Sequence, residues 1–271
     1  MPPRQRLYRT PAVVLKRMDL GEADRIITLY SRDMGKLRAV AKGVRRTTSR
    51  SAGHLEPFTL SDCLFAVGRD LDVISQADTL ESFRHIREDL ILTTHAYYLA
   101  ESVDLLTEDR MDNRAVFDVL VDGLRELDGG YPLKLAIIAF HLRLLDALGY
   151  RPELRECVGC RAPIAPEHNQ FSPAMGGVLC PRCVADGAET RQTDGARPRP
   201  SARHIGVPCL KLLRFVQQSA GQRSVNAPSD VTREAEALLR DYAEYLVERR
   251  LRSPALIARV TEADAYNPEP Q

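Results

Sequence analysis

An alternating stretch, KLRAVAK, occupies residues 36–42. Successive side chains of a β-strand point to opposite faces, so Leu37, Ala39 and Ala41 would share one face. The opposite face would carry Lys36, Arg38, Val40 and Lys42. This pattern predicts a strand that gives a small apolar interior and a basic exterior, as expected in a small barrel.

Four other short strands are predicted before residue 81, separated by turn residues such as glycine and aspartate. Together with the alternating strand, they cover residues 12–18, 26–30, 36–43, 58–67 and 71–75. Five short strands without a long helix predict a five-stranded Greek-key barrel, the oligonucleotide-binding (OB) fold.

The N-terminal part of the chain is strongly basic. Residues 1–50 contain 13 Lys or Arg against four Asp or Glu, although the whole chain carries a net charge of only +1. The loop at residues 43–53 adds arginines, hydroxyls and glycines, which suit contacts to phosphate. We expect DNA contacts from Lys36, Arg38, Lys42, Arg45, Arg46 and Arg50, with Arg17 and Arg25 as further candidates. The alternatives are a solvated basic surface and a polar hairpin without a partner.

From residue 81 onward the apolar spacing becomes helical. One predicted helical face comprises Phe83, Ile86, Leu90, Tyr97 and Val103. Asn113 and Ser229 are the expected N-caps of later helices. His141 stands alone in an apolar helix, so a hydrogen-bonded core histidine is expected there.

The predicted fold class is therefore α+β, a barrel followed by a helical bundle that carries a cysteine module. The predicted parts are an OB-fold DNA-binding domain at 1–80, helical segments at 81–152 and 205–260, the cysteine module at 153–185, a flexible loop at 186–204 and a tail at 261–271.

Two Cys-x-x-Cys pairs lie within the cysteine module. They are Cys157 with Cys160, and Cys180 with Cys183, separated by 19 residues. Two such hairpins supply the four thiolates of a tetrahedral structural zinc site, so one Zn²⁺ is predicted. Four thiolates leave no open position for water, which disfavours catalytic zinc. The two other cysteines, Cys63 and Cys209, are expected to be buried small residues.

Enzyme classes find little support in the sequence. The chain lacks a phosphate-binding Gly-x-x-x-x-Gly-Lys-Ser/Thr loop and a dinucleotide-binding glycine motif. A zinc deaminase would need a His-x-Glu upstream of Cys180, but His168 is followed by Asn169. A redox role for Cys-x-x-Cys would need a βαβ context. The expected function is therefore non-enzymatic. The start, MPPRQRLYRT, lacks a secretory apolar run, so a cytoplasmic location without membrane contact is expected. Nucleoid association is a further expectation.

Several motifs resemble those of the RecO family of bacterial DNA repair proteins. They are DLGEADR at 19–25, GKL at 35–37, AKGVRR at 41–46, GRDL at 68–71 and LGYRPEL at 148–154. The resemblance covers nearly the whole chain apart from the 186–204 loop and the tail.

The resemblance implies a protein that binds single- and double-stranded DNA and anneals complementary strands. It also implies partners: RecR, the C-terminal tail of single-stranded DNA-binding protein, and indirectly RecA, which is helped to load onto coated strands. A different possibility is a zinc-containing regulator or protein-interaction scaffold that does not bind DNA directly. The oligomeric state is left open by the sequence.

Overall fold

The computed structural model describes residues 6–187, 202–218 and 225–266. The chain divides into two compact units. The first unit consists of Met1–Gly130 and Arg252–Gln271, and the second of Tyr131–Leu251. Each unit is described below by itself.

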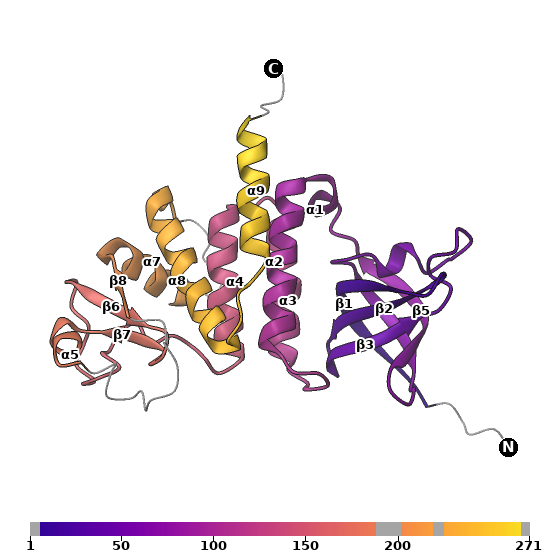
Figure 1. Cartoon of the computed structure of the whole chain (residues 1–271), viewed down its shortest axis with the longest axis horizontal. Coiled ribbons are helices and arrows are strands. Elements are labelled where there is room, and N and C mark those ends of the chain that lie inside the picture. Colours follow the sequence, from indigo (N-terminus) through magenta and orange to yellow (C-terminus); the bar gives the residue numbers. More distant parts are fainter. Residues whose placement is uncertain (1–5, 188–201, 219–224, 267–271) are drawn as a thin grey trace. The chain divides into compact units, whose positions relative to one another are not determined.

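The first unit begins with a closed five-stranded barrel in the order β1-β2-β3-β5-β4 (Figure 1, indigo and purple). Its strands are β1 (Leu7–Leu20), β2 (Asp24–Ser31), β3 (Gly35–Ala41), β4 (Leu60–Ala66) and β5 (Asp72–Glu81), with the short 3-10 helix η1 (Gly53–Leu55) before β4. Apart from the parallel β3–β5 pair, neighbouring strands are antiparallel. The predicted five-stranded barrel is confirmed.

β1 is longer than the predicted strand because it has two partners. Leu7 to Val13 pair with β4, and Ala12 to Leu20 pair with β2. A register shift between Val14 and Lys16 lies in the part of β1 paired with β2, and irregularities of this kind bend strands around a barrel.

The barrel interior is filled as the alternating pattern predicted. Leu37, Ala39 and Ala41 are at most 3% exposed and belong to one apolar cluster with residues of the other strands. Cys63 lies in the same cluster and is fully buried. Burial raises the pKa of its thiol to about 12, so Cys63 is a protonated core residue, as expected.

Helices complete the first unit: α1 (Arg84–Glu88), α2 (Leu90–Leu106), α3 (Arg114–Asp128) and α9 (Ser253–Tyr266). The predicted continuous helical face from Phe83 to Val103 is wrong. Asp89 is extended and ends α1, and its side chain accepts a hydrogen bond from the Leu92 N–H as the N-cap of α2. Leu90 is 65% exposed and Tyr97 38% exposed, so they do not share one buried face with Ile86 and Val103.

The C-terminal helix α9 packs against α2. Glu101 on α2 accepts hydrogen bonds from the backbone N–H groups of Arg252 and Ser253 and from the Ser253 hydroxyl, which satisfies donors at the start of α9. The predicted tail at 261–271 is therefore wrong for its first six residues, which are helical, whereas 267–271 lie outside the described residues.

The second unit combines helices with a small sheet of order β7-β6-β8. Its elements are α4 (Leu133–Ala147), β6 (Asn169–Ser172), β7 (Gly177–Leu179), α5 (Pro181–Ala185), β8 (Arg203–Ile205), α7 (Val207–Gln218) and α8 (Ser229–Val247). β8 occupies the end of the predicted 186–204 loop, and residues 188–201 lie outside the described ranges.

One core joins the cysteine module to the helices of the second unit. Phe171 and Val178 of the small sheet are fully buried beside Leu142 of α4 and Leu238 of α8. Cys209 of α7, also fully buried, belongs to this core, as expected for a small buried residue. The sequence analysis divides this region into a cysteine module and the two parts of one helical domain, whereas core packing joins the module to α4, α7 and α8 within one compact unit.

Three further predictions about the helices concern single residues, and two of them hold. The Asn113 side chain accepts a hydrogen bond from the Val116 N–H and caps α3. His141 is 1% exposed, bonds the Ile137 carbonyl through Nδ1, and has its pKa lowered to about 4 by burial. Ser229 is instead the first residue of α8, because the N-cap position falls on Pro228. No helix in the described ranges has the length and apolar character needed to cross a membrane.

Candidate functional site

The basic loop at 43–53 is held against the β1–β2 turn. The Gly43 N–H donates to the Asp24 carboxylate at 2.7 Å, and the Arg45 N–H donates to the Ala23 carbonyl at 3.0 Å. Val44 is 3% exposed and joins the barrel core. The first residues of the loop are thus held in place by the barrel. Asp24 was not among the expected site residues, although an aspartate at a strand end is a common backbone partner.

Three of the predicted DNA-contacting arginines engage nearby carboxylates. Arg25 donates to Asp19 at 3.0 Å and lies 3.8 Å from Glu56, and Arg17 pairs with Glu56. Arg45 lies 3.5 Å from Asp19. The hydrogen bond from Arg25 lowers the pKa of Asp19, which favours its charged form. These arginines are partly neutralised and would have to exchange partners to bind phosphate.

Four predicted cations differ from these arginines. Arg38, Lys42, Arg46 and Arg50 are exposed. Within residues 6–187, 202–218 and 225–266, none of the four has an acidic side chain within ion-pair distance. Their charge is therefore available to a ligand without the cost of breaking an existing pair.

Lys36 has a different role from the one predicted. Its residue is only 8% exposed, and its Nζ donates to the backbone carbonyls of Asp104 at 2.6 Å and Thr107 at 2.7 Å. These carbonyls belong to the C-terminal end of α2, where a cation is favourable. The predicted exposure of Lys36 is wrong, because α2 covers this end of the barrel exterior.

Aromatic side chains can serve as stacking platforms for bases, but two of those on the barrel are buried. Tyr30 and Phe65 have no exposed surface. The Phe65 ring stacks on Tyr8 at 5.0 Å between centroids, and the Tyr30 hydroxyl donates to the Asn113 carbonyl at 3.2 Å. Both are core residues that cannot receive a base in this conformation.

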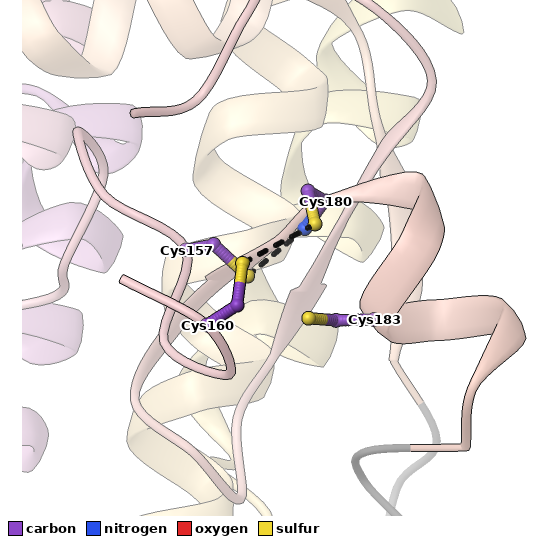
Figure 2. Close-up of side chains that lie close together, drawn as sticks. All are labelled: Cys157, Cys160, Cys180 and Cys183. Carbon is purple, nitrogen blue, oxygen red and sulfur yellow. Dashed lines mark hydrogen bonds between the residues drawn. The ribbon is translucent and has the colours of Figure 1, made fainter. Parts of the chain in front are cut away.

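The four cysteines of the second unit form one cluster (Figure 2). Their sulfur atoms all lie within 4.8 Å of one another, and the Cys160 and Cys180 sulfurs are 3.8 Å apart. A tetrahedral zinc ion with Zn–S bonds of about 2.3 Å would hold its sulfurs about 3.8 Å apart. The thiols form no disulfide, so all four could serve as metal ligands.

Local backbone structure brings the two cysteine pairs together. The first pair lies in a tight turn where the Arg161 N–H donates to the Cys157 carbonyl at 2.8 Å and Arg161 adopts a positive φ of 63°. The second pair lies at the start of α5, after β7. A Cβ added at Gly159 would approach the Cys183 sulfur to 3.0 Å, so the close approach of the turns favours glycine.

The electrostatic surroundings of the cluster favour at least one thiolate. Burial alone would raise the pKa of Cys157, but hydrogen bonds from the N–H groups of Cys180, Cys160 and Gly159 lower it to about 6. Burial raises the pKa of Cys183 to about 12. A bound divalent cation would compensate the charge of the full thiolate set, and thiolates are the ligands preferred by zinc.

Two family models together match most of the chain. Residues 5–83 match the model described as "Recombination protein O N terminal", and residues 87–255 match "Recombination protein O C terminal". The first match coincides with the barrel and the second with the helices and the cysteine cluster.

Full-length relatives agree with these matches. The chain is 39% identical over 264 residues to the "DNA repair protein RecO" of Roseiflexus sp. (strain RS-1), covering 96% of this chain and 88% of that protein. It is 37% identical over 261 residues to that of Pelotomaculum thermopropionicum, with 96% and 97% covered. For Nocardioides sp. (strain ATCC BAA-499 / JS614) the identity is 39% over 257 residues, with 93% and 100% covered.

Proposed function

The chain belongs to the RecO family of DNA repair proteins, and from this premise we propose that it is a DNA-binding recombination mediator without catalytic activity. It binds single- and double-stranded DNA and anneals complementary strands. Together with RecR, it helps RecA load onto strands coated by single-stranded DNA-binding protein, whose C-terminal tail it binds.

The observation that carries this proposal is a group of exposed cations that form no ion pair within the part of the chain that the structure describes: Arg38, Lys42, Arg46 and Arg50. A ligand that replaces their counterions gains affinity through counterion release, and phosphate backbones are the common ligands of this kind. Annealing follows because two strands held beside these cations repel each other less than they do in free solution.

The cysteine cluster supports a stabilising role for one zinc ion rather than a chemical one. Cys157, Cys160, Cys180 and Cys183 would occupy all four positions of a tetrahedral ion, which leaves none for an activated water. The metal would join the two turns that carry the cysteines, in a segment whose apolar residues already pack on α4 and α8.

An annealing assay with the full-length protein tests the DNA-binding proposal. The double variant Arg46→Glu with Arg50→Glu should anneal complementary oligonucleotides at least tenfold more slowly, because two attractive contacts become repulsive. A matched control is Arg84→Glu with Arg114→Glu, which makes the same change in net charge at two exposed helical arginines. Equal annealing rates in the parent and the Arg46/Arg50 variant would contradict the proposal.

The proposed contact with single-stranded DNA-binding protein needs its own test. Immobilised full-length chain should retain that protein only when the C-terminal tail of the partner is intact. Equal retention of the intact and tail-truncated partner would contradict this part of the proposal.

A further inference from the structure

Apolar side chains form a line across the outside of the barrel. The strand register places Met18 of β1 opposite Ile26 of β2, Ile26 opposite Val40 of β3, and Val40 opposite Val73 of β5. Met18 is 56% exposed and the other three are half-buried. We call these four residues the aliphatic stripe.

The stripe lies on the outer face because its neighbours along β2, β3 and β5 face the interior, whereas on β1 the outward direction of Met18 follows from its 56% exposure and its pairing with Ile26. Ile27, Ala39 and Ile74 each follow or precede a stripe residue and belong to the barrel core. Side chains alternate along a strand, so the stripe residues point the other way. Met18 is 56% exposed, so this end of the row is open to solvent, whereas the C-terminal end of α2 covers the barrel exterior at Lys36.

Free cations border the stripe on both sides. Arg38, in register with Thr28, lies two residues before Val40 along β3, and Lys42 lies two residues after it. Both cations are exposed and lack an ion pair in the described part of the chain. Lys16 of β1, which pairs with Thr28 as Arg38 does, differs because it forms an ion pair with Asp104. An occupant of the stripe therefore meets apolar surface at its centre and unpaired positive charge at its edges.

We propose that the aliphatic stripe contacts the bases of an unpaired DNA strand, while Arg38 and Lys42 hold its phosphates. This inference rests on the proposed function and adds a preference for single strands. Unpaired bases expose apolar faces next to a negative backbone, which complements a stripe bordered by cations. A duplex stacks its bases inside and presents phosphates, so it would use the cations but not the stripe.

The basic loop extends the same path. The loop at 43–53 begins directly after Lys42, and its first residue, Gly43, is hydrogen-bonded to Asp24 of β2 beside the stripe. A strand lying along β3 can therefore pass from Arg38 over Val40 to Lys42 and on to Arg46. Aliphatic contacts take the place of aromatic stacking here, because Tyr30 and Phe65 of the barrel are buried.

Binding titrations with the full-length protein test this proposal. The probes are fluorescent (dT)20 and a 20-base-pair duplex, each measured by anisotropy for the parent and for Met18→Ser. Loss of apolar contact at Met18 should weaken (dT)20 binding about fivefold to tenfold and change duplex binding less than about twofold. The salt dependence should stay the same, because no phosphate contact is removed.

The matched control is Leu80→Ser, which removes an apolar side chain with 53% exposure from β5 away from the stripe and should leave both affinities unchanged. A second variant, Val40→Thr, keeps the side-chain shape and should weaken only (dT)20 binding. Thermal unfolding by circular dichroism checks that each variant is folded.

Three outcomes would overturn the inference. The first is (dT)20 binding that Met18→Ser leaves unchanged, and the second is an equal loss of affinity for (dT)20 and for the duplex. The third is a change confined to self-association in sedimentation, which would assign the stripe to a contact between copies of the chain. If the parent binds neither DNA probe, the proposed function fails as well, so the two failures are distinguishable.

Discussion

Lys36 and Lys42 lie at opposite ends of the same alternating stretch, yet the structure gives them opposite roles. Replacing each by methionine removes the charge and keeps most of the stem. We predict that Lys36→Met lowers the free energy of unfolding of the first unit, whereas Lys42→Met weakens DNA binding and leaves stability almost unchanged.

The magnitude follows from the surroundings of Lys36. Its side chain is 11% exposed, and Nζ donates to two carbonyls at 2.6 and 2.7 Å and lies 3.5 Å from the Asp109 carboxylate. A buried carbonyl that loses its donor costs about 1–3 kcal/mol, and a cation at a helix C-terminus contributes about 0.3–1 kcal/mol. Partial hydration of the helix end reduces the sum, so we expect a loss of about 3 kcal/mol.

Lys42 is exposed and has no such partners among the residues that the structure describes, so Lys42→Met should change stability by less than about 0.5 kcal/mol. The chain lacks tryptophan, which makes urea unfolding followed by circular dichroism the suitable assay. Anisotropy with labelled DNA measures the second effect. If Lys36→Met were as stable as the parent and lost as much DNA affinity as Lys42→Met, this reasoning would be refuted.

Three other predictions concern the metal, pH and backbone. Purified protein should contain about one zinc per chain, and chelation should lower its unfolding temperature; a ratio near zero would exclude the site. Burial lowers the pKa of His141 to about 4, so its contribution to stability is complete above about pH 6.5 and falls by about 3 kcal/mol toward pH 4. The variant His141→Phe should therefore show a flatter pH profile of the free energy of unfolding. A profile equal to that of the parent would contradict this. Gly35→Ala should lower the free energy of unfolding in urea by more than about 2 kcal/mol, because φ of Gly35 is +63° and the new Cβ would lie 1.9 Å from the Met111 carbonyl oxygen. The control Gly53→Ala should be nearly neutral, because its Cβ would meet no atom within 4 Å. Equal effects of the two substitutions would argue against strain at Gly35.

Local patterns predicted the features that depend on short-range geometry. Alternation along residues 36–42 correctly placed Leu37, Ala39 and Ala41 in the interior, because the pleat of a strand fixes which side chains share a face. The Cys-x-x-Cys spacing likewise predicted the cluster, since the backbone of each pair turns so that both of its thiols face one metal position.

Features that depend on tertiary packing were not predictable from these patterns. Nothing local distinguishes Lys36 from Lys42; only the position of the α2 C-terminus covers one and leaves the other exposed. Similarly, helical spacing continues through Asp89, but that residue is extended and Leu90 is exposed. The aliphatic stripe joins residues of four strands, so it becomes visible only when the register is known.

The salt dependence of single-strand binding tests most directly the claim that the free cations of the barrel bind DNA. Four phosphate contacts, by Arg38, Lys42, Arg46 and Arg50, predict a slope of log affinity against log salt of about −2.8 for single strands. Replacing Arg46 and Arg50 by alanine should reduce this slope to about −1.4. A parent slope near zero, or a slope that the double replacement leaves unchanged, would contradict the account.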